Sequence, residues 1–257
     1  MKEQDDDDGE LRTMKLRLSK GALIVGAGDA TGGAIARRFA RAGYEVCVTR
    51  RFVEHLQPLV EQIRTEGGRV HPFGSDARDE QAVVTLFNHI EEQIAPLDVV
   101  VFNIGANVRF PVAEMTERVY RKVWEMGALA GFLVGREAAR AMLPRGQGTI
   151  IFTGATASVR GGKGFAAFAG AKHALRALAQ SMARELGPEG IHVAHVVIDG
   201  AIDTEWIRNN FPERYKLKER DGILDPDAIA EQYWQLHQQP RNAWTHELDL
   251  RPWIEPW

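Results

Sequence analysis

Two side chains spaced four residues apart, Phe168 and Lys172, raise the question of chemistry in this chain. They lie in the stretch Gly164 to Leu186, whose apolar residues recur at helical spacing, so both are expected on one face of a helix. A lysine can bind anionic or hydroxyl groups and can lower the pKa of a neighbouring hydroxyl, whereas a phenyl ring has no proton to exchange. The spacing therefore places a lysine beside a ring that cannot exchange a proton with it.

A second chemical signal is the glycine-rich segment "LIVGAGDATGGAIARRFA". Gly26, Gly28 and Gly32 stand between an apolar run and a helical pattern. Glycines at a strand-to-helix turn let the backbone approach a pyrophosphate, and the free amides of the helix N-terminus bind it. The same glycines could serve only close packing of helix on strand, but their place after the first strand favours a dinucleotide site.

The next apolar run ends in "VTRRFVEH", which places Arg50 and Arg51 at the tip of the second expected strand. An acidic residue there selects a free ribose hydroxyl and a basic one a 2′-phosphate, so the arginines favour NADP(H) over NAD(H). The alternative is that both arginines are merely solvated, and Asp29 in the first turn adds negative charge against a phosphate.

The elements that must position these residues follow a regular alternation from Ser19 onward. Continuously apolar runs such as "ALIVGAG", "LDVVVFNIG" and "IHVAHVVID" are separated by helical patterns. Such strands are typical of a parallel sheet covered on both faces, so we predict an α/β fold with a doubly wound parallel sheet (Rossmann fold) in a single domain, residues 19–257. Residues 1–18, with four consecutive aspartates, are predicted to be a disordered acidic tail. The aromatic and charged segment 203–224 is predicted to be a substrate lid, with a solvated pair of surface helices as the alternative.

Composition excludes several classes of function. The net charge of −3 and the pI of about 6.3 provide no basic field for nucleic acid. No stretch reaches the roughly 18 to 20 apolar residues that span a bilayer, and no spaced His, Cys and carboxylate cluster suggests a metal. The single cysteine, Cys47, lies in an apolar run and fits a reducing cytoplasm. We therefore expect a cytoplasmic protein with a small-molecule substrate, no nucleic acid, no membrane and no metal.

Taken together, these motifs resemble the short-chain dehydrogenase/reductase family over residues 20 to 253. The family's TGxxxGxG turn is matched by "VGAGDATG", with Ala30 in place of the middle glycine, and its acidic residue beside the adenine by Asp76 in "GSDA". Its NNAG segment is matched by "FNIG", which keeps Asn103 and Gly105, and its PGxxxT segment by "DGAIDT", which lacks the proline. The resemblance implies an NAD(P)-binding oxidoreductase. With the turn and the arginines it gives the cofactor-binding candidates Gly26, Gly28, Asp29, Ala30, Thr31, Gly32, Arg50, Arg51, Asp76, Ala77, Asn103, Gly105, Lys172, Gly200 and Thr204.

The resemblance also implies a catalytic quartet of asparagine, serine, tyrosine and lysine, and here the chain departs from the family. Alignment on Lys172 puts Phe168 at the tyrosine, Ala155 at the serine and Gly127 at the asparagine. Only the lysine remains, and the resemblance implies that it holds the nicotinamide ribose. Hydride delivery to a carbonyl leaves an alkoxide that needs a proton, so the loss predicts a change of chemistry.

Several residues could replace the missing groups. Thr156 follows Ala155 directly, with Ser158 and Thr153 as less favoured hydroxyls, and Asp199 stands at the carboxyl end of the sixth strand where an acid could act. The alternative for each is a capping role in a loop. His173 should point away from the site, and His192 and His195 should pack in the core or at an interface. The catalytic candidates are Lys172, Asp199 and Thr156, and the substrate-pocket candidates are Phe168, Ala155, Asn107, Arg109 and Trp206, Arg109 being suited to a carboxylate or phosphate.

Three functions remain open from the sequence. The first is an NADP(H)-dependent oxidoreductase with a non-standard site, the second a non-redox dinucleotide sensor or regulator, and the third a lyase or isomerase on the same fold. The resemblance further implies a homodimer or homotetramer, for which Trp253 and Trp257 are candidate anchors unless they pack on their own subunit.

Overall fold

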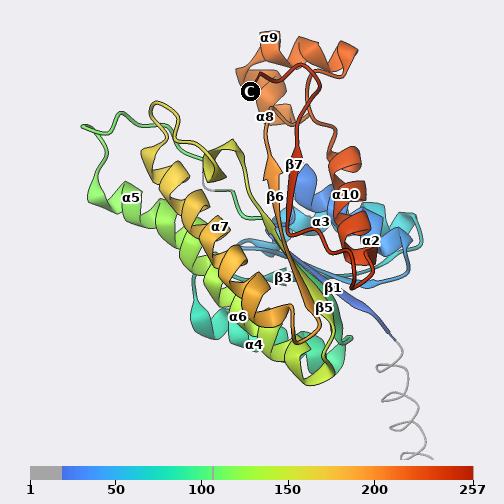
Figure 1. Cartoon of the computed structure of the whole chain (residues 1–257). Coiled ribbons are helices and arrows are strands. Elements are labelled where there is room, and N and C mark those ends of the chain that lie inside the picture. Colours follow the sequence, from blue (N-terminus) through green and yellow to red (C-terminus); the bar gives the residue numbers. More distant parts are fainter. Residues whose placement is uncertain (1–18, 106, 257) are drawn as a thin grey trace, which may run out of the picture.

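The computed structural model describes residues 19–105 and 107–256, so the predictions for the tail 1–18 and for Trp257 lie outside the described residues. Seven parallel strands form one sheet in the order β3-β2-β1-β4-β5-β6-β7 (Figure 1). They are β1 (Gly21–Val25), β2 (Glu45–Arg50), β3 (Arg69–Gly74), β4 (Leu97–Phe102), β5 (Gly148–Thr153), β6 (Ile191–Ile198) and β7 (Glu247–Leu250). The predicted doubly wound sheet is confirmed.

Helices cover both faces of this sheet (Figure 1). On one face lie α2 (Thr31–Arg41), α3 (Gln57–Thr65) and α10 (Pro226–Gln238). On the other lie α4 (Glu80–Gln93), α6 (Ala130–Met142) and α7 (Ala166–Leu186), with α5 (Glu117–Trp124) leading into α6. The strand order reverses between β1 and β4, so the carboxyl ends of these two strands flank the crevice in which doubly wound sheets bind ligands.

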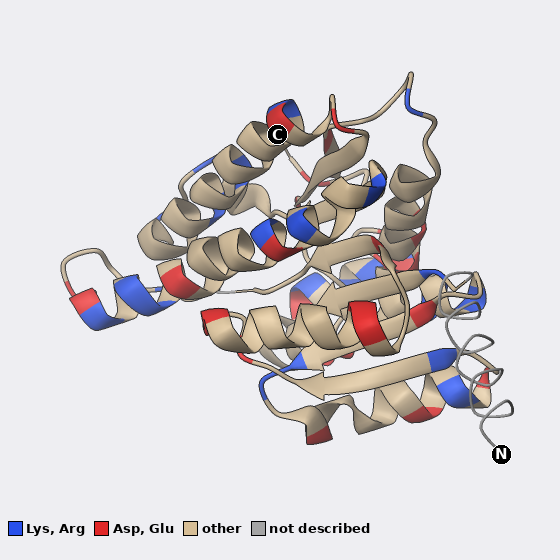
Figure 2. Ribbon diagram, turned by 90° about the horizontal axis from the view of Figure 1, so that it is seen from below, with Lys and Arg blue, Asp and Glu red and all other residues tan. Residues whose placement is uncertain are grey.

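The strands are apolar because helices cover both of their faces. Strands β1, β5 and β6 carry no Lys, Arg, Asp or Glu, and charged residues of both signs lie mainly on the helices and loops (Figure 2). His192 and His195 in β6 are buried, as predicted, and Cys47 is a buried free thiol. No helix in the described ranges is long and apolar enough to cross a bilayer.

The long helical stretch between β4 and β5 is interrupted at a place that matters for the site. A π-helical turn, η2 (Glu125–Leu129), separates α5 from α6. Gly127 in this turn faces α7 so closely that a Cβ added to it would lie 2.9 Å from the Cβ of Ala171. Glycine therefore permits the approach of α7 to the turn.

Segment 203–224 folds as short helices, α8 (Glu205–Asn210), α9 (Pro212–Tyr215) and the 3-10 helix η5 (Lys216–Arg220). They lie beside the C-terminal segment above the carboxyl ends of the strands (Figure 1). Two contacts join the two segments: Arg214 pairs with Glu255 at 2.7 Å, and the Trp253 indole N–H donates to the Arg220 carbonyl at 3.0 Å. Trp253 is otherwise largely exposed, with 76% of its surface accessible.

Candidate dinucleotide-binding and active site

The glycine-rich turn is closed by backbone contacts that only small residues allow. Gly26 has φ +87°, and a Cβ on it would lie 2.8 Å from the Asn103 carbonyl oxygen. A Cβ on Gly32 would lie 2.6 Å from the Gly26 carbonyl oxygen. The Asn103 side-chain amide donates to that same Gly26 oxygen at 3.1 Å, which ties the end of β4 to the turn. These contacts fix the conformation of the turn, so that its backbone amides lie at the start of α2.

The start of α2 has the features of an anion site. Its N-cap, Ala30, has no side chain that can cap, and the first turn holds no acidic residue. Thr31 is buried, and its hydroxyl has no hydrogen-bond partner within the described ranges. An orphaned hydroxyl and uncapped amides at an 11-residue helix fit the phosphates of a dinucleotide.

A cavity of about 210 Å³ opens beside this turn, at the switch point between β1 and β4. The predicted residues that line it are Gly26, Gly28, Arg50, Arg51, Asp76, Ala77, Asn103 and Gly105. Six further lining residues were not predicted: Val25, Thr49, Ser75, Arg78, Ile104 and Met126. Of these, Arg78 could have been predicted from the sequence, because it follows Asp76 by two residues in a loop where the two side chains can pair.

Lys172 is buried at the carboxyl ends of β4 and β5. Its ammonium group donates to the Thr153 carbonyl at 2.8 Å and to the Ile104 carbonyl at 3.2 Å. Burial lowers the pKa of Lys172 to about 8. The Phe168 ring, on the same face of α7, has its centroid 5.9 Å from the Lys172 nitrogen. The lysine is therefore held by backbone carbonyls, next to a ring that offers it no hydroxyl.

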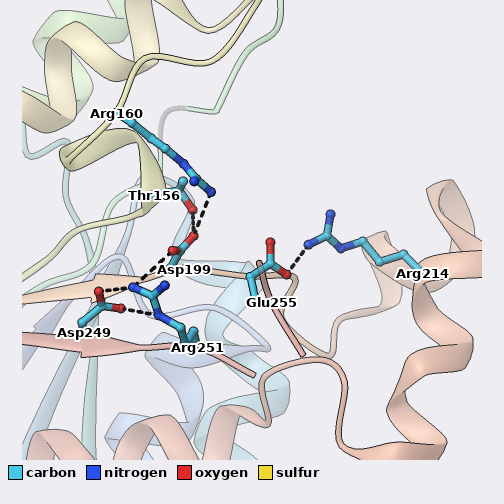
Figure 3. A network of polar contacts seen from close by, with 7 residues as sticks. All are labelled: Thr156, Arg160, Asp199, Arg214, Asp249, Arg251 and Glu255. Atoms are coloured by element: carbon cyan, nitrogen blue, oxygen red, sulfur yellow. Dashed lines mark hydrogen bonds and ion pairs between the residues drawn. The ribbon is translucent and has the colours of Figure 1, made fainter. Parts of the chain in front are cut away.

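The hydroxyl of Thr156 meets the carboxylate of Asp199. Thr156 lies in the 3-10 turn η4 (Thr156–Ser158) after β5, and its Oγ1 donates to Asp199 Oδ1 at 2.5 Å (Figure 3). Asp199 is buried at the end of β6, with an Arg160 nitrogen at 3.8 Å and an Arg251 nitrogen at 3.5 Å. Arg251 also pairs with Asp249. Two guanidinium groups thus compensate the buried carboxylate that accepts from Thr156.

The other candidate hydroxyls and the histidine of α7 have partners within the fold. Thr153 Oγ1 shares a hydrogen bond of 2.8 Å with the Tyr233 hydroxyl. Ser158 Oγ accepts from the Ala155 amide at 3.1 Å, and His173 Nδ1 lies 2.8 Å from the Ala169 carbonyl oxygen. These contacts are structural, which leaves Thr156 as the hydroxyl that faces an acid.

His195 belongs to a buried polar group that the sequence did not indicate. Its Nδ1 lies 3.0 Å from a Glu247 oxygen, and Arg176 of α7 binds the same carboxylate through two contacts of 2.6 Å. Burial lowers the pKa of His195 to about 4, so the imidazole is neutral near pH 7. Little in the sequence points to this group, because Glu247 is far from His195 along the chain.

The remaining predicted residues do not line the cavity. Asn107, Arg109 and Trp206 are exposed, and the Arg109 guanidinium lies 6.0 Å from the Phe165 ring centroid. Thr204 caps α8 by accepting from the Ile207 amide. Further residues outside the cavity are Ala155 and Phe168 from the substrate set, and Asp29, Ala30, Thr31, Gly32, Lys172 and Gly200 from the cofactor set. In the described ranges, no three His, Cys, Asp or Glu side chains gather as metal ligands do.

Comparison with known proteins gives consistent matches. The family described as short chain dehydrogenase matches residues 20–214. A 3-oxoacyl-[acyl-carrier-protein] reductase, MabA of Mycobacterium avium, is 33% identical over 193 residues, which is 74% of this chain and 70% of the relative. The crystal structure of a short-chain dehydrogenase from Rhodopseudomonas palustris is 50% identical and covers 91% of this chain and 99% of its own, with a TM-score of 0.79. An actinorhodin polyketide ketoreductase variant crystallised with NADPH shares the fold at 24% identity, with a TM-score of 0.82 and coverage of 93% and 98%.

Proposed function

This chain belongs to the short-chain dehydrogenase/reductase family, a family of NAD(P)-dependent oxidoreductases, and we propose that it is an NADP(H)-dependent member with a non-standard active site. In this proposal Thr156 and Asp199 handle the proton that the family's tyrosine exchanges with the substrate oxygen. The observation that carries it is the hydrogen bond of 2.5 Å between Thr156 and the buried Asp199 carboxylate, directly after the alanine that replaces the family's serine.

The cavity supports the choice of dinucleotide. Its lining holds Arg50, Arg51 and Arg78 against the single acid Asp76, and this excess of positive charge suits a 2′-phosphate. The amides and the Thr31 hydroxyl at the start of α2 would hold the pyrophosphate. Lys172, fixed by two carbonyls, would present its remaining N–H to a ribose hydroxyl.

The bound nicotinamide would donate a hydride during reduction and accept one during oxidation, so the protein has to move one proton to or from the substrate oxygen. During oxidation of an alcohol, Thr156 Oγ1 accepts the substrate hydroxyl proton while its own proton passes to Asp199 Oδ1. During reduction the protonated Asp199 returns its proton to Thr156, and the Thr156 hydroxyl protonates the new alkoxide. Arg160 and Arg251, whose nitrogens lie 3.8 and 3.5 Å from the Asp199 carboxylate, compensate its buried charge and hold it beside Thr156.

Phe168 and Ala155 make the proposed substrate side less polar than a serine and tyrosine would. Such a surface suits an imine or an activated C=C bond in addition to a ketone. Reduction of an imine or an activated C=C bond needs a phenol less than reduction of a ketone does. We propose that segment 203–224, with Trp206 and Asp203, closes over the substrate, and that the exposed Arg109 attracts an anionic group of the substrate.

The same family membership supports a cytoplasmic homodimer or homotetramer. Exposed aromatic side chains on α5 and α6, among them Tyr120, Trp124 and Phe132, offer apolar area for a partner subunit. Size-exclusion chromatography with light scattering measures the assembly directly, and a monomer at micromolar concentration would contradict it.

The experiment is a binding and turnover assay on purified protein. We expect NADPH to bind more tightly than NADH in a fluorescence titration, and NADPH oxidation with at least one member of a panel of carbonyls, imines and enones. Thr156→Val should lower turnover about 100-fold with the NADPH affinity unchanged, because it removes the group that passes the proton. Asp199→Asn tests the same step from the other partner, and Thr65→Val, an exposed threonine at the end of α3, is the control.

Two results would contradict the proposal in different ways. Binding of neither dinucleotide at high micromolar concentration would exclude a nucleotide-dependent function. Tight binding of NADPH with no oxidation of any panel member would favour the second candidate, a non-redox sensor, or a lyase or isomerase. The absence of polar side chains at Phe168, Ala155 and Gly127 is the observation that keeps this candidate in view.

A further inference from the structure

Asp76, which lines the cavity, is paired with a neighbouring arginine: Arg78 binds both oxygens of its carboxylate. The Arg78 Nε donates to Oδ1 at 2.9 Å and Nη2 to Oδ2 at 2.5 Å, while the Arg78 backbone amide adds a third contact at 3.1 Å. Both side chains line the cavity, and both are largely shielded, with 24% of Arg78 and 35% of Asp76 exposed. The pair is a bidentate, partly buried ion pair rather than a loose surface contact.

The Asp76 carboxylate also lies close to the arginines at the end of β2. The Ser75 amide donates to the Arg50 carbonyl at 2.9 Å, which fixes the ends of β2 and β3 side by side. The pKa of Asp76 lies below its usual range, mainly because of the hydrogen bonds from Arg78, with a smaller effect of the Arg51 charge. Asp76 is thus ionised near neutral pH and faces the region in which Arg50 and Arg51 would meet a phosphate.

An ionised carboxylate in this position would repel every anionic part of a dinucleotide. It would repel a 2′-phosphate most, since that group adds one to two negative charges beside the arginine pair. Arg78 cancels this repulsion while leaving Arg50 and Arg51 to attract the phosphate. The cancellation has a smaller effect on a cofactor that presents a neutral ribose hydroxyl at the same place.

We propose that Arg78 is a specificity-determining positioning residue: by neutralising Asp76 it lets the Arg50 and Arg51 end of the cavity accept a 2′-phosphorylated dinucleotide. This inference rests on the proposed NADP(H) dependence. Arg78 acts through Asp76 and not through contact with the phosphate, which distinguishes it from the arginines of β2.

A double-mutant cycle on the full chain tests the inference by binding alone. Dissociation constants for NADPH and NADH are measured by fluorescence titration on the parent, Arg78→Met, Asp76→Asn and the double variant. Arg78→Met exposes the Asp76 charge, so it should weaken NADPH binding about tenfold more than NADH binding. The double variant, which has neither charge, should return the NADPH to NADH preference to within about threefold of the parent. The preference lost in Arg78→Met should also recover partly at high salt, because screening weakens the repulsion.

The control is Arg184→Met, an exposed arginine on α7 that binds a carbonyl of its own helix, and its affinities should not change. Equal weakening of both dinucleotides in Arg78→Met would overturn the inference and indicate a purely structural role. A double variant as weak toward NADPH as Arg78→Met would overturn it too, because Arg78 would then bind the phosphate itself. A parent that prefers NADH contradicts the proposed function instead, and the shift in preference still decides the role of Arg78. A parent that binds neither dinucleotide overturns both.

Discussion

The two halves of the sheet differ in what has been kept from the family. On the side of β1 to β4, Gly26, Gly32, Asn103 and Asp76 match the pattern that the resemblance implies, and eight of the predicted cofactor residues line one cavity. On the side of β5 to β7, the backbone path is kept, since Lys172 still lies one turn after residue 168 and beside β5. In the alignment that the resemblance implies, the side chains there differ, with Ala155, Phe168 and Gly127 at the positions of the family's serine, tyrosine and asparagine.

This difference separates two tasks, binding the dinucleotide and transferring the proton, which depend on different parts of the chain. Binding a pyrophosphate depends on backbone amides and on the absence of side chains, so few alternatives to glycine exist. Proton transfer depends on one ionisable group within reach of the substrate, which another residue can supply. In the proposed function the fold exchanges its acid while it keeps its nucleotide site, and the hydrogen bond between Thr156 and Asp199 supports this proposal.

The largest expected effect comes from breaking the nucleotide half. A Cβ at Gly32 would lie 2.6 Å from the Gly26 carbonyl, so Gly32→Val must displace the turn and its amides. We expect about a 1000-fold loss of NADPH affinity, corresponding to about 4 kcal/mol, with the helical circular dichroism retained. The control is Gly161→Val, where the added Cβ meets nothing within 4 Å, and its affinity should be that of the parent. An affinity within tenfold of the parent for Gly32→Val would show that the turn does not hold the phosphates.

The second-largest expected effect concerns Lys172, which donates to a carbonyl after β4 and to one at the end of β5, and so contacts both halves. Burial lowers the pKa of Lys172 from 10.5 to about 8, so between these values the unfolded chain binds a proton that the folded chain does not. The stability of the parent should therefore rise with pH from about 8, relative to Lys172→Met, by about 2 kcal/mol between pH 7 and pH 9.5. Urea unfolding of both proteins at several pH values measures this difference, and groups common to both cancel. A constant difference across the range would mean that the folded lysine keeps its ordinary pKa.

The sequence predicted the nucleotide half better than the chemistry half for a physical reason. A strand, a glycine turn and a helix are local, so residues 21–50 contain nearly all that the phosphate site needs. The contacts of Asp199 come from Thr156 and Arg160 after β5 and from Arg251 after β7, and they meet only when β6 pairs with both strands. Sequence reasoning could name Thr156 and Asp199 as separate candidates, but it could not predict that they share a hydrogen bond. Nor could it predict the π-helical turn at Gly127, which depends on the approach of Ala171.

The smallest expected effect, and the sharpest test of the comparison, restores the family's hydroxyls on the unchanged backbone. If the path of β5 and α7 is kept, Phe168→Tyr with Ala155→Ser places a phenol beside Lys172 and a hydroxyl at the end of β5. We expect about a tenfold gain in carbonyl reduction with NADPH, well below the 100-fold or more that a fully positioned acid contributes, because the surrounding pocket is not adapted to it.

The single variant Phe168→Tyr is the matched control and should gain less, since the serine that orients the substrate oxygen is missing. If the double variant binds NADPH like the parent but gains nothing, residues 155 and 168 do not occupy the family's positions and the contrast between the two halves is wrong. A gain that disappears in Lys172→Met would tie the new phenol to the lysine, because an uncharged side chain cannot lower the pKa of a neighbouring phenol.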